Sequence, residues 1–509
     1  MSVGIVLAAT VAPVAGGAVS SPRHGTSDHG GTLTFGETTG ITSLDPIHVK
    51  GSGASGGNEA GAIYGYLMRY DTSTARYVPY LAKSLTSNAA YTTWTLRLRP
   101  GMTFSDGTPF DAQAVVENIQ RDLAPANHSV AGQKLGLVQS VAATGTTTVV
   151  FTLKQPWSEF ADALSDVPGL VAAPRYLADV AAGDANATPV GAGPFEVSNF
   201  QPGTSLTLAP NPRFPFGKPR LSRLTFTFIP GGTATLQAFD AGQLNAALLI
   251  DAPSVEQAKE AGISALATTF DMGTELLMND RSGSPLGNPK LREAITVAFD
   301  PSVYNERVNQ GVALAGNLLF PPGSAWYSKG EPTIPYNVKK ARQLVAEVEH
   351  ETGWNGTLHF LCSNVYQDLP AVFESMLQPI GITLNVTDDE PQATFQDQVI
   401  VNHNFDLAYF GIDASDANPF PALWADFVST SDFSGYADPQ MAAAIDSLGA
   451  AATPVAKKAA LRRIVATWQA TFPVLDLGIT TYRTIHQPDV HGLYQTVLGT
   501  TLFDKAWVS

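Results

Sequence analysis

The stretch LRPGMTFSDGTPFDAQAVVENIQR runs from Leu98 to Arg121 and has the density of a motif. Residues 92–98 alternate and are rich in β-branched and aromatic types, which predicts a strand. Pro100-Gly101 and Asp106-Gly107 predict tight turns. Asp111 stands at the N-cap position of a predicted helix that ends near Arg121. The stretch also contains Ser, Asp, Thr and Arg, residue types that are common in catalytic sites. Its role therefore has to be judged from the rest of the chain.

Composition limits the possible functions. The chain has 509 residues, enough for several domains with large cores. Its net charge of -15 argues against a broad affinity for nucleic acid or anionic membranes. A single cysteine, Cys362, excludes an intramolecular disulfide and a cysteine-based zinc site. Because Cys362 stands in an apolar, strand-like run, we interpret it as a buried structural thiol.

The N-terminus indicates export. Residues 1–20 are apolar and small, as in a signal peptide, and residues 21–31 have the composition of a flexible linker. Val14-Ala15-Gly16 is followed by Gly17 and not by the cysteine of a lipoprotein cleavage site. No later run has the roughly 18 apolar residues of a membrane span. We therefore expect an extracytoplasmic protein, in the periplasm, in the cell envelope or secreted, without a lipid anchor.

The coarse pattern along the chain is mixed α/β. Strands are predicted over residues 32–36, 149–153, 205–209, 221–229, 358–362 and 383–386. Helices are predicted over 112–123, 233–241, 289–298, 338–350, 369–378, 439–448 and 454–471. The regular alternation after Gly273 predicts a sheet flanked by helices in the second half of the chain.

Two catalytic motifs overlap in GSGASGGNEAG, residues 51–61. One matches a dinucleotide-binding loop and the other a serine-hydrolase elbow centred on Ser55. Each motif requires a hydrophobic strand immediately before it, and SLDPIHVK does not supply one. We interpret the segment as a loop that leads into a helix over residues 59–68, and a secreted hydrolase using Ser55 is kept as the alternative from a different class. The nine histidines are scattered, so we expect no metal site and no cofactor.

Several ordered segments together resemble the extracytoplasmic solute-binding proteins of the peptide/nickel class, family 5, which serve ABC importers. The segments are SLDP (43–46), IYGYLMRYD (63–71), VPYLAKSL (78–85), the stretch up to Arg121, PVGAGPFEVSNFQPGTSLTLAPN (189–211), KLREAITVAFD (290–300), IPYNVKKARQLVAEV (334–348), FDLAYFGIDASDANPF (405–420) and GYADPQMAAAID (435–446). In this family the opening stretch is scaffold, so we interpret it as structural.

The resemblance implies a two-lobed periplasmic-binding-protein fold with a hinge. The first lobe would comprise residues 32–269 and 480–509, with 52–184 as an extra subdomain, and the second lobe residues 272–478. The hinge would lie at the crossings near 268–273 and 475–480. Such a protein would be a monomer without enzyme activity that captures a solute between closing lobes. It would then deliver the solute to the membrane permease subunits of an ABC importer.

The family's pocket also implies ligand-binding positions. From the first lobe these are Glu37, Thr39, Gly40 and Ile41, with Asn127 and His128 from the subdomain. The second lobe would contribute Tyr409, Phe410, Gly411, Asp413, Ser415 and Trp424. We expect one of Tyr409 and Phe410 to face the cleft and the other the core.

The ligand class stays open at this stage. In peptide binders of this family an aspartate that pairs with the peptide's α-amino group falls at Ser415, and an aromatic residue falls at Ile412. Asp413 shares a strand face with Ser415 and is the substitute acid we expect. We rank a peptide first, then an oligosaccharide or other organic solute, then a metal chelate or haem. A signalling role in place of import is the further alternative.

Overall fold

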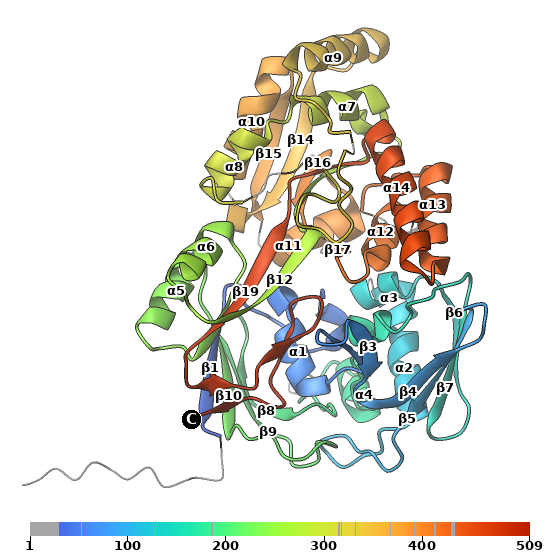
Figure 1. Cartoon of the computed structure of the whole chain (residues 1–509), viewed down its shortest axis with the longest axis vertical. Helices are drawn as coiled ribbons and strands as arrows, with labels where there is room; N and C mark the ends of the chain where they lie inside the picture. Colours follow the sequence, from blue (N-terminus) through green and yellow to red (C-terminus); the bar gives the residue numbers. More distant parts are fainter. Residues whose placement is uncertain are drawn as a thin grey trace, which may run out of the picture.

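The computed structural model describes residues 30–509 apart from 52, 128, 185–186, 314–315, 317, 331, 367, 391, 412–413 and 429–432. The expected signal peptide therefore lies outside the described residues, as do His128 and Asp413. The chain is built around two main sheets, one in the lower and one in the upper half of Figure 1, with a smaller antiparallel sheet beside the lower one.

The larger sheet is formed by strands from distant parts of the sequence. Its order is β17 (Ala414–Ser415), β12 (Ala265–Met272), β19 (Thr480–His486), β11 (Ala246–Leu249), β1 (Thr32–Glu37), β10 (Arg223–Phe228), β9 (Ser205–Pro210) and β8 (Phe195–Gln201). In β1, Leu33 and Phe35 alternate with polar residues and are fully buried. The Phe35 ring packs edge-on against Phe226 and Phe503, so the first strand and the C-terminal segment share one core.

The second sheet is flanked by helices, as predicted. Its order is β15 (Thr383–Glu390), β14 (Thr357–Ser363), β16 (Leu407–Phe410), β13 (Glu275–Met278) and β18 (Val474–Asp476). The surrounding helices are α7 (Pro289–Ala298), α8 (Pro301–Asn309), α9 (Val338–Thr352), α10 (Leu369–Leu377), α11 (Gln392–Asp397), α12 (Phe420–Phe427), α13 (Pro439–Ala450) and α14 (Pro454–Thr471). Cys362 is buried in β14, and burial raises the pKa of its thiol to about 12.

The opening stretch forms the strand, turns and helix that its sequence predicts. Its strand β5 belongs to the small sheet, ordered β4 (Ala82–Ser87), β5 (Thr93–Leu98), β7 (Thr148–Leu153) and β6 (Val138–Ala143). The helix is α2 (Ala112–Leu123), whose first turn is capped by a 3.0 Å hydrogen bond from Ala114 N to Asp111 Oδ1. At the end of α2, both Arg121 Nη atoms donate to the Asp45 carboxylate at 2.6 Å. The motif therefore anchors the SLDP turn, which is a structural role.

One helix is shorter than predicted. The helix expected over residues 59–68 is α1 (Gly57–Tyr64), and β2 (Met68–Asp71) begins soon after it. Gly65 ends the helix because it adopts a φ of 66°, a conformation that glycine tolerates best. The remaining helices of the lower half are α3 (Val130–Lys134), α4 (Pro174–Ala181), α5 (Gly232–Asp240) and α6 (Ala252–Glu260).

The chain passes between the two main sheets at neighbouring places. It leaves the larger sheet at Met272 and enters the second sheet at Glu275. It returns to the larger sheet between Asp476 and Thr480. A further crossing brings residues 414–415 back as β17, which pairs with the end of β12. The lobe boundaries and the hinge stay predictions, and the first two crossings are the observations that support them.

The two halves also touch beside these crossings. Ser158 N donates to Gly449 O at 2.8 Å, and Gln155 Nε2 donates to Asp446 Oδ1 at 2.7 Å. Trp157 packs edge-on against Phe420 of α12 with ring centroids 5.4 Å apart. Helices α12–α14 therefore rest on the small-sheet region, on the right-hand side of Figure 1.

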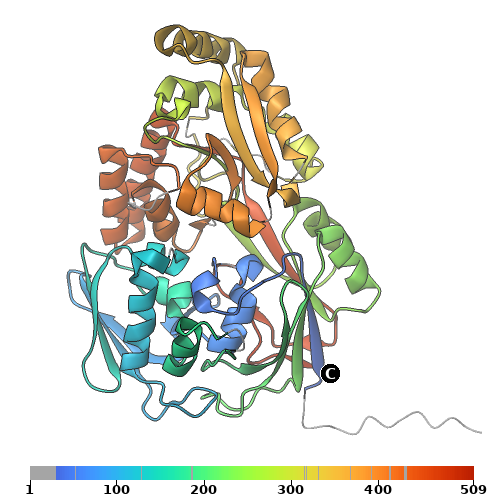
Figure 2. The ribbon, with the colours of Figure 1, turned by 180° about the vertical axis from the view of Figure 1, so that it is seen from behind.

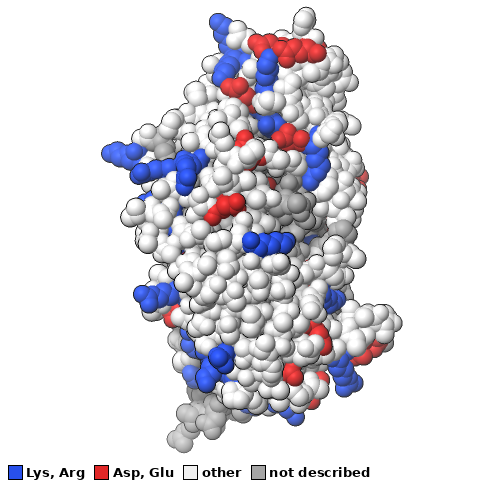
Figure 3. Space-filling model, turned by 90° about the vertical axis from the view of Figure 1, so that its right-hand side faces the viewer, with Lys and Arg blue, Asp and Glu red and all other residues white. Residues whose placement is uncertain are grey.

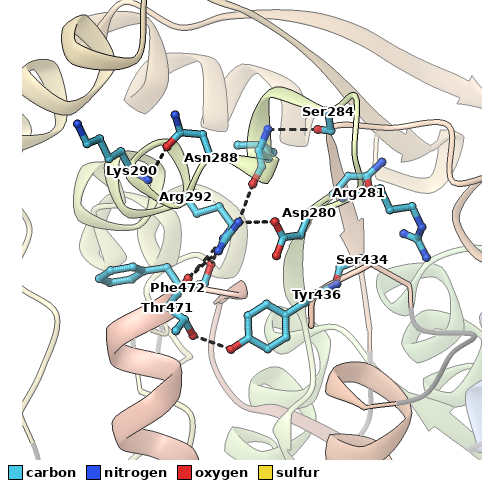
Figure 4. A network of polar contacts seen from close by, with 12 residues as sticks. Asp280, Arg281, Ser284, Asn288, Lys290, Arg292, Ser434, Tyr436, Thr471 and Phe472 are labelled. Carbon is cyan, nitrogen blue, oxygen red and sulfur yellow. Dashed lines mark hydrogen bonds and ion pairs between the residues drawn. The ribbon is translucent and has the colours of Figure 1, made fainter. Parts of the chain in front are cut away.

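A buried arginine fixes the end of α14. Arg292 Nη1 donates to Asp280 Oδ1 at 2.6 Å and to Leu286 O at 2.8 Å, while its Nε and Nη2 reach the carbonyl groups of Thr471 and Phe472 (Figure 4). These last carbonyls of a helix otherwise have no partner inside the helix. The network therefore holds the start of β18, and with it the return crossing, in place.

Charged side chains are sparse on the surface. In the face drawn in Figure 3, acidic and basic residues are scattered over a mostly uncharged surface, and no patch of one sign gathers on its described part. This agrees with the low fraction of charged residues, 15%.

Candidate functional site

A large cavity lies between the two main sheets, at the crossings. Its volume is ≈ 1460 Å³, and both halves of the molecule contribute to its wall. The crossings themselves form part of the wall, through Gly273, Thr274 and residues 477–483. Helices α6 and α8, which lie one above the other in Figure 1, also line it. Because ordinary small-ligand pockets measure roughly 300–1,000 Å³, this cavity has room for an extended ligand.

The floor of the cavity is the segment from Thr38 to Leu44, which follows β1. Thr39 Oγ1 donates to Ala54 O at 2.7 Å, and Gly203 N donates to Ile41 O at 2.8 Å. Gly40 lies so close to Gly203 that an added Cβ would be 3.0 Å from its Cα atom. Several hydrogen bonds thus hold this segment, and the Asp45–Arg121 pair fixes the turn that follows it.

Two buried glutamates lie at this floor. Glu37 and Glu59 are almost completely buried, and Glu37 Oε1 accepts a 2.7 Å hydrogen bond from Asn58 Nδ2. Burial raises the pKa of Glu37 well above its ordinary value and that of Glu59 to about 7. Since two buried carboxylates repel each other, the pair is stable when at least one carboxyl is protonated.

An aromatic wall faces the floor from the upper half. Tyr409 packs against Tyr366 with ring centroids 4.9 Å apart, and its hydroxyl lies 3.4 Å from that of Tyr304. Phe410 packs against Phe395 and Phe433. Tyr409 and Phe410 both line the cavity, although we expected one of them to face the core. The reason is that β16 ends at Phe410, at the cavity edge.

The wall carries charges of both signs. Lys50 and Arg483 come from the half that contains the larger sheet, and Arg307, Asp368 and Asp397 from the half that contains the second sheet. Burial lowers the pKa of Lys50, while the negative charge of Asp397 opposes this shift. The acidic Asp251 is already used as the cap of α6, where it accepts hydrogen bonds from Ser254.

Half of the twelve residues expected at the site line this cavity. They are Thr39, Gly40, Ile41, Tyr409, Phe410 and Gly411. Whether they bind ligand stays a prediction.

The other expected residues lie elsewhere. Glu37 is buried beneath the floor. Asn127 is exposed, and its side chain donates to Arg121 O. Ser415 is buried in β17, and Trp424 packs on Gly136, where an added Cβ would lie 2.2 Å from the ring. His128 and Asp413 lie outside the described residues. A binding role for these positions stays a prediction as well.

The sequence interpretation missed the cavity residues that follow the return crossing. Residues 477–483 bring Arg483 into the wall, and α8 and the segment after β14 bring Tyr304 and Tyr366. Arg483 is a charged residue in the mostly apolar and β-branched run ITTYRTIH (479–486), and this contrast is the signal that could have indicated a cavity residue here. Ser55 also lines the cavity, but the 3-10 helix Pro46–His48 precedes it where a hydrolase elbow needs a strand.

Two further structural observations concern metals and membranes. Among the residues that the structure describes, no group of three or more His, Cys, Asp or Glu side chains is placed to hold a metal ion. In the same part of the chain, no helix has both the length and the apolar character to cross a bilayer.

Comparison with solved structures shows the fold. The Helicobacter pylori periplasmic binding protein DppA, solved in complex with the peptide STSA, superposes with a TM-score of 0.80 at 20% identity, covering 94% of this chain and 99% of that one. AgaA, solved in complex with agropinic acid, gives a TM-score of 0.81 at 21% identity, with the same shares covered. The two-lobed binding-protein fold expected from the sequence is therefore confirmed.

Curated relatives match over part of their length. The probable di/tripeptide-binding protein 5 of Pseudomonas aeruginosa is 29% identical over 302 residues, which are 55% of this chain and 57% of that protein. The glutathione-binding protein GsiB of Escherichia coli K12 is 29% identical over 320 residues, 60% of each chain. The matches thus span a little under two thirds of these relatives. Residues 76–434 match the family described as bacterial extracellular solute-binding proteins, family 5 Middle. The chain belongs to the family 5 extracellular solute-binding proteins.

Proposed function

We propose that this protein captures a peptide in the cavity between its two lobes and delivers it to an ABC importer. The observation that carries the proposal is the position of the cavity. It lies at the crossings, and its wall is formed by Thr39–Ile41 from one half and Tyr409–Gly411 from the other. A ligand that contacts both walls binds the closed arrangement better than the open one and so shifts the lobes toward closure.

Relatives support the choice of a peptide. The names of two of them specify di- or tripeptides and glutathione, and the DppA structure contains a tetrapeptide. The cavity offers a peptide charges of both signs for its ends and tyrosine rings for its side chains. We propose further that the protein acts as a monomer outside the cytoplasm, without catalytic activity, and that its partners are the permease subunits.

A second candidate is a non-peptide organic solute such as an oligosaccharide. The specific observation in its favour is the wall of Tyr304, Tyr366 and Tyr409, because aromatic faces also suit sugar rings.

A ligand panel tests the proposal and separates the candidates. Thermal unfolding would be followed with mixed-sequence di- to pentapeptides, glutathione, disaccharides and a nickel–histidine complex. We expect a peptide to raise Tm, because a ligand that binds only the folded state stabilises it. A rise with sugars alone, or with the nickel complex alone, would contradict peptide capture. Hydrolysis of a peptide or ester that is lost in Ser55→Ala would contradict the binding role itself.

A further inference from the structure

Arg483 lies near the middle of β19, in the centre of the larger sheet. Its Cα is paired with Leu249 of β11 and Ala267 of β12. Because residues directly opposite each other in an antiparallel pair point to the same face, the Arg483 side chain lies beside these apolar neighbours. Leu249 is fully buried, whereas Arg483 is half-buried and lines the cavity. A cation thus stands where an apolar sheet face meets the cavity.

The guanidinium of Arg483 has no ion-pair partner among the residues that the structure describes. Its Nε is buried and makes no hydrogen bond, and no ion pair joins it to any carboxylate in the described part of the chain. A partly buried cation without a partner is costly, so a nearby anion stabilises it. The planar guanidinium fork matches a carboxylate in particular.

The neighbouring charged groups on this side of the cavity contact other residues. Lys259 is paired with Glu256 at 2.9 Å, and Asp251 accepts the capping hydrogen bonds of α6. Glu59 is fully buried beside Glu37, and burial raises the pKa of both carboxyls. Lys50 adds a second positive charge. Arg483 and Lys50 are thus the two cations on this side that form no ion pair with a described residue.

We propose that Arg483 binds a carboxylate of the ligand, which in a peptide is the C-terminal carboxylate; this inference rests on the proposed function. Asp368 and Asp397 are exposed on the opposite wall. A zwitterionic ligand can then direct its carboxylate toward the lower lobe and its ammonium group toward the upper one. Arg483 is three residues beyond Thr480, so this contact joins the ligand directly to the strand that leaves the return crossing.

The test compares free-acid and amidated peptides. The peptide that binds most tightly in the panel and its C-terminal amide would be titrated by calorimetry into the wild type, Arg483→Gln and Arg483→Lys. Arg223→Gln, at an exposed position of β10 in the same sheet, is the matched control. We expect Arg483→Gln to weaken binding of the free-acid peptide by about 30-fold or more, which is the usual loss for a buried charge partner. Binding of the amidated peptide should weaken by less than about 3-fold. Arg483→Lys should keep a preference for the acid, and Arg223→Gln should behave as wild type.

Three outcomes would overturn the inference. One is equal affinity of the wild type for the acid and the amide. Another is an unchanged affinity of Arg483→Gln for the acid. The last is equal weakening of acid and amide by Arg483→Gln, which would assign Arg483 to a contact between the closing lobes. If no peptide binds, the proposed function fails, and acetate and succinate replace the peptides as probes. Stabilisation by these acids that is lost in Arg483→Gln would then uphold the carboxylate site, and its persistence would refute it.

Discussion

Glu275 and Asp476 stand directly opposite each other on the antiparallel strands β13 and β18, and both side chains are fully buried. Glu275 is the first residue after one crossing and Asp476 the last before the other. Within the described part of the chain, neither Glu275 oxygen has a hydrogen-bond partner, while Asp476 Oδ1 accepts a 3.1 Å bond from Gly478 N. Like charges opposite each other in a sheet are unfavourable, so at least one carboxyl carries a proton. The crossings are thus built on acids that are stable when neutral.

This pair predicts a stability that depends on pH. Burial raises the pKa of Glu275 and of Asp476 well above their ordinary values, and burial with the nearby Asp416 raises that of Asp271 to about 9. The folded state therefore keeps protons that the unfolded chain has lost. Its stability is fully present below the ordinary carboxyl range and falls as pH rises through the folded-state pKa values.

Glu275→Gln should reduce this loss. The glutamine amide can donate to Asp476 Oδ2, so we expect the variant to be about 1–3 kcal/mol more stable than wild type at pH 9, with a smaller difference at pH 5. Urea unfolding at the two pH values measures it. Glu260→Gln, at an exposed position, serves as the control. A variant that is less stable than wild type at pH 9 would refute the role of the buried charge.

The Arg292 network predicts a large loss of stability. Arg292→Met leaves Asp280 and the carbonyl groups at the end of α14 without this donor, and such losses usually cost about 3–5 kcal/mol. Denaturant unfolding measures the change. Arg462→Met, at an exposed position of α14, should change stability by less than about 0.5 kcal/mol. Similar stabilities of the two variants would mean that the network contributes little.

The first crossing depends on Gly273. A Cβ at this position would lie 2.4 Å from Thr480 Cβ, on the strand that leaves the return crossing. Gly273→Ala should therefore destabilise the protein by about 1–3 kcal/mol and weaken ligand binding, because it forces the two crossings apart. Gly287→Ala is the control, since the nearest atoms to its added Cβ lie 3.6 Å away. Wild-type stability and affinity in Gly273→Ala would show that the crossings tolerate separation.

Ligand binding should compact the molecule. The cavity lies between the two halves, and contacts with both walls favour the closed arrangement. Small-angle scattering with and without a saturating amount of the tightest peptide should show a smaller radius of gyration in the bound state. An unchanged profile with binding confirmed by calorimetry would contradict closure around the crossings, but not binding itself.

The sequence by itself determined the local structure. Helices α2, α7 and α14 begin and end where the pattern predicts, because Asp111, Asn288 and Thr453 cap their first turns. The order of the family segments also determined the fold, since together they specify one topology. Turn and cap residues act over a few positions, so the places where helices and turns begin and end can be predicted from adjacent residues in the sequence.

Only the tertiary structure decided which side chains share the cavity. For example, the sequence could not show that α12 places the Trp424 ring against Gly136, about 290 residues earlier in the chain. Arg483 and Tyr304 are about 180 residues apart, yet they line the same space. The partners of a long-range contact are set by how the sheets pack and where the chain crosses between them. Strand periodicity can show that Arg483 interrupts an apolar run, but it cannot show that no acid among the described residues forms an ion pair with it.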